Sequence, residues 1–132
     1  MDNINLIFPE ILISSSIMFL LVLGVFKKNS SKLIHNLSII SLFITIILIF
    51  NNQFSSNFSL FNNSYKVDYL SSFMKVITLL GGAFVLSISS RYLKIYKIFK
   101  IEYPILILCS ILGMMVMISS NDLIVFYMGL EL

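Results

Sequence analysis

Charged residues are scarce in this sequence, and their scarcity excludes a water-soluble globular protein. Only 11% of the 132 residues are charged, while 58% are hydrophobic and the mean hydropathy is +1.00. Because a soluble domain carries about 25% charged residues, this chain would lack a soluble surface in water. The sequence therefore predicts that lipid is its main solvent.

Cysteine is equally scarce, since Cys109 is the single one. One cysteine cannot form an internal disulfide or a cysteine-based metal cluster, and it does not indicate a redox compartment. The sequence also lacks a phosphate-binding loop, a Ser/His/Asp set, a haem-binding pair and a metal motif. We therefore expect this chain to hold no cofactor and no metal, and to oxidise or reduce nothing by itself.

The N-terminus lacks the features of a secretory signal. Asp2 stands where a signal peptide has its basic region, and no small-residue cleavage site follows the first apolar stretch. We therefore expect the first apolar stretch to be a retained membrane helix.

Long apolar runs are what the sequence has in abundance. A helix needs about 17–25 apolar residues to cross the hydrocarbon core, and residues 6–26, 33–50, 68–90 and 103–119 satisfy this. A fifth span begins near residue 122 and is cut off at residue 132. The prediction is an all-α polytopic transmembrane bundle, in which residues 1–132 form a single partial membrane domain. Residues 51–66 are rich in Asn and Ser and predict an exposed loop.

Several helix starts are marked by residues that favour a first turn. Pro9 and Glu10 fit a first turn, because no backbone N–H is missed there and the helix dipole favours an acid. Asp68 can cap the third helix, Glu102 opens the fourth, and Asp122 with the preceding Ser and Asn caps the fifth.

Basic residues alternate between the connections, which predicts the orientation of the chain. The second connection has only Lys66, and the fourth has no Lys or Arg. The first and third connections are basic and contain Lys27, Lys28, Lys32, Arg91, Lys94, Lys97 and Lys100. We therefore expect the N-terminus outside, with residues 27–32 and 91–102 on the cytoplasmic or matrix side.

The third connection predicts an interfacial amphipathic segment. If it is helical, Lys94 and Lys97 point away from a face that carries Tyr92, Tyr96, Phe99 and Tyr103. Aromatic side chains at headgroup depth, with cations toward water, are typical of a topology anchor in the bilayer. Specific lipid binding or nucleic-acid binding is the alternative.

Glu131 is the strongest candidate for chemistry, because it lies deep in a predicted span. It follows Asn121 by ten residues, which is about 15 Å at the helical rise and half of the roughly 30 Å hydrocarbon core. A carboxylate there must be protonated, paired or hydrated, and a group poised between these states can pass protons. The alternative is that Glu131 is merely the penultimate residue of an exposed chain end. Half a helix and a terminal carboxylate in mid-bilayer favour a fragment of a longer protein.

Three further ionisable residues lie in or beside the predicted spans. Lys75 is about 10 Å inside the third helix, where it either extends to the outer interface or pairs with an acid. Glu10 is explained by dipole stabilisation in a first turn or by a buried polar role. His35, at the inner end of the second helix, is expected to be hydrated.

Small residues predict tight contacts between helices. They are Gly81, Gly82, Ala83 and Ser87 in the third helix, and Ser110 and Gly113 in the fourth. Three methionines, at 114, 115 and 117, are interpreted as adaptable packing rather than as metal ligands.

The end of the chain resembles a known family. Glu102, Tyr103 and the stretch ILILCSILGMMVMISSNDLIVFYMGLEL at 105–132 resemble the fourth and fifth helices of subunit N of bacterial NADH:quinone oxidoreductase. The mitochondrial counterpart is subunit 2 of complex I. The opening LIFPEILI resembles the start of the same subunit, and VDY at 67–69 with Phe73 and Lys75 resembles its third helix. The match covers nearly all of this chain but a third or less of the family's length.

The resemblance implies a role in proton transfer for Glu131, which matches the key glutamate of the family's fifth helix. The ending GLEL with the preceding NDL favours subunit N over its relatives L and M. The family's partner lysines lie on the seventh, eighth and twelfth helices, so this sequence supplies one member of a proton path. Asp68, Lys75 and Glu102 match family positions with less definite roles, and Lys75 is a candidate ion-pair partner.

The resemblance also implies the setting of the intact protein. It would be a subunit of a proton-translocating NADH:quinone oxidoreductase in the bacterial cytoplasmic membrane or the mitochondrial inner membrane. Its partners would be the lipid bilayer and other membrane-arm subunits of complex I, with no nucleic acid. Other subunits would handle NADH, flavin, iron–sulfur clusters and quinone, so this fragment alone would neither catalyse nor pump. Two alternatives stay open, namely a subunit of a related cation/proton antiporter complex and a small non-catalytic membrane scaffold.

Overall fold

Five helices and one short hairpin make up the residues that the computed structural model describes, which are 2–26, 31–52, 58–60, 65–95, 100 and 102–132. The elements are α1 (Asp2–Phe26), α2 (Ser31–Asn52), β1 (Phe58–Leu60), β2 (Tyr65–Val67), α3 (Tyr69–Ile95), α4 (Glu102–Ser119) and α5 (Leu123–Glu131). The predicted all-α architecture with a shorter fifth helix is therefore confirmed, with the hairpin as an addition.

Four of these helices are long and apolar enough to cross a membrane. The spans are Ile7–Phe26, Ser31–Asn51, Tyr69–Leu93 and Glu102–Ser119. Their outer surfaces carry large apolar side chains, among them Phe19, Ile47, Phe84 and Leu106, all more than half exposed. A protein whose solvent is lipid requires such a surface, so the fold is that of a multi-pass membrane protein.

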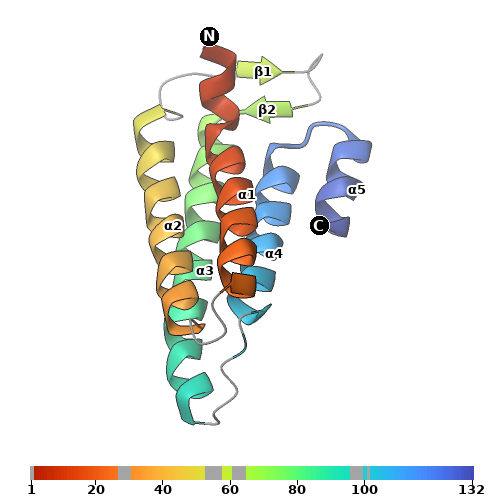
Figure 1. Cartoon of the computed structure of the whole chain (residues 1–132). Coiled ribbons are helices and arrows are strands. Elements are labelled where there is room, and N and C mark those ends of the chain that lie inside the picture. Colours follow the sequence, from red (N-terminus) through yellow and green to blue (C-terminus); the bar gives the residue numbers. More distant parts are fainter. Residues whose placement is uncertain (1, 27–30, 53–57, 61–64, 96–99, 101) are drawn as a thin grey trace.

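The four long helices form a bundle in which neighbours in sequence run in opposite directions (Figure 1). α1 packs against α2 and α4, and α3 also packs against α2 and α4. Helices α1 and α3 therefore occupy opposite corners of the bundle. The N-terminus, the hairpin and the connection between α4 and α5 lie together at one end (Figure 1), which is called the hairpin end below.

The core of the bundle consists of side chains that recur every three or four residues along each helix. This spacing places them on one face of a helix. The buried apolar residues are Ile13, Ile17 and Leu20 in α1, Ile34, Leu42, Ile46 and Ile49 in α2, Val76, Leu79, Ala83 and Leu86 in α3, and Ile105, Leu108, Ile111 and Met115 in α4.

The hairpin was not predicted from the sequence. β1 and β2 pair antiparallel at 58–60 and 65–67, which overlap the loop predicted at 51–66, with Phe58 opposite Val67 and Leu60 opposite Tyr65. Val67 is fully buried, so the hairpin packs its end against the bundle just before α3 begins. The remaining predicted loop residues at 53–57 and 61–64 lie outside the described residues.

Two helices extend beyond the predicted spans, because helical structure continues further than the apolar runs. α1 begins at Asp2, so Pro9 lies inside this helix and Glu10 is two turns beyond the first turn. α3 continues to Ile95, so Tyr92 belongs to the end of this span while Tyr103 belongs to α4. The predicted face that would join them runs through residues 96–99, which lie outside the described part.

Candidate functional site

A buried ion pair between Glu10 and Lys75 lies inside the bundle. The Lys75 Nζ atom donates a hydrogen bond to Glu10 Oε1 across 2.6 Å. The side chains are 0% exposed for Lys75 and 8% exposed for Glu10. Moving either charge alone into an apolar interior costs several kcal/mol, so each charge compensates the burial of the other.

The pair joins two helices at opposite corners of the bundle. Glu10 comes from α1 and Lys75 from α3, while α2 and α4 pack between these helices. The long lysine side chain thus crosses the interior to reach a carboxylate 65 residues earlier in the chain. Both residues lie within the apolar spans, roughly 10 Å from the helix ends at the hairpin end.

This geometry decides between the predictions made for the two residues. Lys75 pairs with an acid and does not extend to the interface, because its side chain is fully buried. The first-turn explanation of Glu10 is wrong, and its buried polar role is the one observed. The acid that Lys75 contacts is Glu10 in α1. The sequence did not indicate which acid this would be.

The start of α3 is held by a separate hydrogen-bonded turn at Asp68. The Ser71 hydroxyl accepts a hydrogen bond from the Asp68 N–H at 2.8 Å, and the Ser72 N–H donates to the Asp68 carbonyl at 3.0 Å. The Asp68 carboxylate lies 3.3 Å from Lys66 Nζ. Asp68 therefore stands at the predicted cap position, which sets where α3 begins and how far inside the helix Lys75 lies.

Glu131 lies on the outer face of α5. Asp122 stands at the N-cap, as predicted, but its side chain makes no capping hydrogen bond. Within α5 the buried residue is Gly129, whereas Glu131 is exposed. Two residues correspond to about 200° around a helix, so Glu131 faces away from the contact that Gly129 makes. It shares this outer face with Ile124 and Tyr127, both more than half exposed.

The depth of Glu131 follows from the residue next to it. A Cβ atom added to Gly113 would lie 3.2 Å from Leu132 Cβ, so Leu132 is level with Gly113. Gly113 is six residues from the end of α4 at Ser119, or roughly 9 Å at the helical rise. In Figure 1 the C end of the chain lies beside the middle of α4. Glu131 is thus well inside the span and nearer to the hairpin end than the sequence predicted.

Close helix contacts form at some of the predicted small residues and not at others. Gly82 lies directly against the Ile111 side chain, and Gly113 lies against the backbone of Gly129. Gly81 has no atom within 4 Å of an added Cβ, so the contact predicted there is wrong. Gly129 was not singled out from the sequence, although its position two residues before Glu131 could have drawn attention to it.

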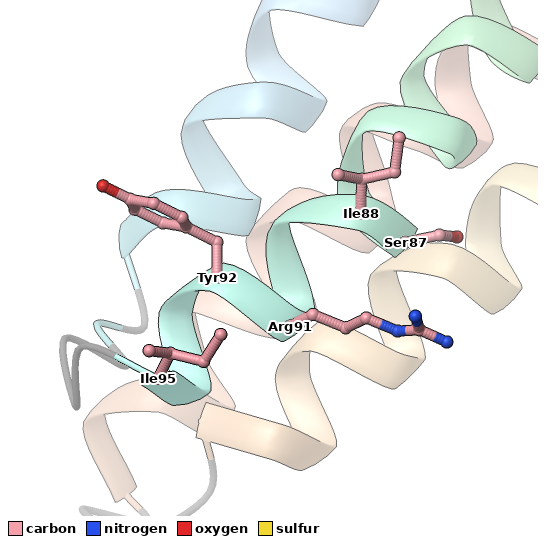
Figure 2. Close-up of a pocket in the computed structure, with 5 residues that line it drawn as sticks. All are labelled: Ser87, Ile88, Arg91, Tyr92 and Ile95. Carbon is pink, nitrogen blue, oxygen red and sulfur yellow. The ribbon is translucent and has the colours of Figure 1, made fainter.

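The remaining candidates offer less to chemistry. His35 is 3% exposed, so the expectation that it is hydrated is wrong. A pocket of about 480 Å³ at the far end of α3 is lined by Ser87, Ile88, Arg91, Tyr92 and Ile95. Figure 2 shows all five on one helix, with Arg91 and Tyr92 extending in different directions. Among the described residues, no group of three or more His, Cys, Asp or Glu could hold a metal ion.

The four apolar spans define a multi-pass helical membrane protein. Two of these spans carry the ion pair of Glu10 and Lys75 in the interior of the bundle. The comparisons with known proteins make this specific, and the resemblance seen in the sequence is confirmed. Along nearly its whole length the chain is similar to proteins named NADH-quinone oxidoreductase subunit N.

Relatives in this family match along nearly the whole chain. Subunit N of Pelagibacter ubique is 74% identical over 132 residues, which cover 100% of this chain and 28% of that protein. Subunit N of Bartonella bacilliformis is 44% identical over 128 residues, covering 96% and 26%. Subunit N of Maricaulis maris is 37% identical over 132 residues, covering 98% and 27%. The chain thus spans about a quarter of the length of the curated relatives it matches. No family model matches the chain.

Proposed function

We propose that the protein containing this chain acts as a membrane subunit of a NADH-quinone oxidoreductase and contributes to proton translocation. The observation that carries the proposal is the 74% identity over all 132 residues to a protein named NADH-quinone oxidoreductase subunit N. The name of this relative favours a role in NADH-quinone oxidoreductase over the two alternatives, a subunit of a cation/proton antiporter complex and a non-catalytic membrane scaffold. Its partners are then the other membrane-arm subunits of complex I.

In this proposal the chain moves protons and other subunits carry the redox chemistry. NADH, flavin, iron–sulfur clusters and quinone are handled outside this chain. Glu131 is the proton-transfer residue, since it is an ionisable group within a span and its side chain faces away from the four-helix bundle. A conformational or electrostatic change that arrives from neighbouring subunits shifts Glu131 between binding and releasing a proton.

Lys75 is the ion-pair partner of Glu10 in this proposal and not of Glu131. Its single ammonium group is 2.6 Å from Glu10 Oε1 and fully buried in the bundle. The partner of Glu131 therefore comes from a segment outside the four long helices, which packs on the outer face of α5.

We also propose that the hairpin end faces outside and the opposite end faces the cytoplasm or matrix. Among the described residues, Lys32, Arg91 and Lys100 lie at the opposite end. The sequence places seven basic residues in the first and third connections, and positive charge favours the cytoplasmic or matrix side. A reporter fused at Lys28 or Lys97 should respond on the cytoplasmic or matrix side, and one at Asn57 on the other. The same response at Asn57 and Lys97 would exclude this orientation.

Replacing Glu131 with Gln tests the function directly. The change keeps the shape of the side chain and removes its titration, so assembly and NADH–quinone turnover should survive in the intact complex. Proton pumping should fall by at least about tenfold, since one positioned proton-transfer group contributes roughly 10²–10⁴-fold. Glu131→Asp should be intermediate, because it still titrates but is shorter by one methylene. Wild-type pumping at wild-type turnover in Glu131→Gln would end the proposal for this residue.

A further inference from the structure

We propose that Gly113 and Gly129 are positioning residues for Glu131, because together they set how closely α5 approaches α4. This inference rests on the proposed proton-transfer function of Glu131. Neither glycine has a side chain that could exchange a proton. Both act through the distance between two helix backbones, which carries the carboxylate with it.

At Gly113 the two helices meet through backbone atoms. A Cβ atom added to Gly113 would lie 2.7 Å from the carbonyl oxygen of Gly129 and 3.4 Å from the carbonyl carbon of Leu132. Ordinary van der Waals contact begins at 3.4 Å, so the Gly129 oxygen would have to retreat by about 0.7 Å. A side chain can rotate out of such a contact, whereas a helical backbone moves only with the whole helix. Any residue larger than glycine at 113 therefore displaces α5.

At Gly129 the contact is softer. An added Cβ would lie 2.5 Å from Met117 Cγ, 3.0 Å from the Gly113 carbonyl oxygen and 3.1 Å from the Met117 backbone N, so its shortest contact is with a side chain. Met117 also lines an apolar groove of about 310 Å³ between α3 and α4, together with Met74, Ile77, Thr78, Met114 and Ile118. A methionine side chain is flexible and can repack into this groove. Alanine at 129 should therefore displace α5 less than alanine at 113.

The position of Glu131 depends on this approach of α5 to α4. Gly129 is the buried residue of α5, and Glu131 follows it by two residues on the same helix. Proton transfer needs the donor and acceptor heavy atoms to lie about 2.6–3.2 Å apart. This range is about 0.6 Å wide, which is similar to the displacement of α5 expected from alanine at 113. A shift of α5 that leaves the fold intact therefore moves Glu131 out of reach of its partner.

The test compares Gly113→Ala and Gly129→Ala with Gly81→Ala as the matched control. Each variant is made in the full-length protein, within the assembled NADH-quinone oxidoreductase in inverted membrane vesicles. We expect Gly113→Ala to lower the number of protons translocated per NADH by at least about threefold, since misplacement by 1 Å can cost roughly 10²-fold. Gly129→Ala should lower it less, and Gly81→Ala should leave it unchanged because no atom lies within 4 Å of the added Cβ.

A second-site change separates positioning from a merely structural role. Met117→Ala removes the atom nearest to the Cβ of Gly129→Ala, while the backbone contacts at 3.0 and 3.1 Å remain. The double variant should therefore recover part of the lost protons per NADH. The same change should not rescue Gly113→Ala, whose clash is with backbone. A structural role alone would change the amount of assembled complex and leave the protons per NADH unchanged.

Each outcome has a distinct meaning. If Glu131→Gln lowers pumping and Gly113→Ala keeps the wild-type ratio of protons to NADH, the positioning inference is overturned and the proposed function stands. If Glu131→Gln pumps normally, the proposed function fails and the positioning inference fails with it. Should Gly113→Ala not assemble, Gly129→Ala decides, and a wild-type ratio in that variant overturns the inference.

Discussion

Glu10 and Glu131 are both carboxylates within apolar spans, but the fold treats them differently. Glu10 is 7% exposed, and its carboxylate accepts a hydrogen bond from Lys75 in the bundle interior. Glu131 is exposed on the outer face of the shortest helix. The bundle therefore compensates the charge of the first within itself and presents the second to whatever packs on α5.

The comparison teaches that depth alone does not identify a proton-transfer residue. Both carboxylates lie roughly 10 Å from the end of their helix that lies at the hairpin end. A charge that is already paired and buried is nevertheless poorly suited to proton exchange. A buried ion pair is instead well suited to fix how α1 and α3 are aligned. If either helix shifted along its axis, two charges would lose each other in the interior. We therefore expect the two sites to respond oppositely to neutral substitutions.

Removing one member of the buried pair should have the largest effect on stability. Lys75→Met removes the ammonium group that compensates the buried Glu10 carboxylate. Glu10→Gln removes the carboxylate that compensates the buried Lys75 ammonium group. Each change should lower the free energy of unfolding by about 3–5 kcal/mol, measured by thermal unfolding of the full-length protein in detergent. Glu131→Gln is the comparison and should lower it by less than either change, because its side chain faces away from the bundle interior. Equal losses at the two sites would break the comparison.

Removing both members of the pair should cost far less than removing one. The double variant Glu10→Gln with Lys75→Met buries no net charge, and neutral replacements of buried pairs are often tolerated. Its free energy of unfolding should lie within about 1 kcal/mol of the wild type, and its proton pumping should be near normal. Additive losses from the two single changes would show that the pair is not the interaction that stabilises α1 against α3.

The exposed ion pair at the start of α3 should give the smallest effect. Lys66 and Asp68 are 3.3 Å apart, with side chains 55% and 40% exposed. Because solvent screens such a pair, Lys66→Met should lower the free energy of unfolding by less than about 1 kcal/mol. The same unfolding measurement applies, and a loss as large as that of Lys75→Met would mean that burial does not govern these charges.

The sequence was sufficient to predict the spans and insufficient to predict which charges meet. Apolar runs of sufficient length predict helices whatever their neighbours are, so the four spans were found. The contact between Glu10 and Lys75 depends on two helices coming to opposite corners of one bundle, which no local pattern records. Helix α1 also begins before its apolar run, because it continues through Asp2, Asn3 and Asn5.

Glycine contacts show the same division between pattern and packing. Small residues were singled out at Gly81 and Gly82 together, yet only Gly82 lies against α4. Adjacent helical residues point about 100° apart, so only one of the two can face a given neighbour, and the sequence does not say which. The hairpin was missed because its strands of three residues each are too short to show a strand periodicity.

The ion pair that crosses the bundle also has a consequence for how the protein is made. Lys75 follows Glu10 by 65 residues, and ribosomes add about 5–20 residues per second. Glu10 is therefore synthesised roughly 3–13 s before its partner, during which α1 and α2 leave the ribosome without α3. The first helical hairpin must spend that interval with its carboxylate compensated by something other than Lys75, such as water or the insertion machinery. Closure of the bundle thus waits for the third span, and the order of translation sets the order in which the charges are matched.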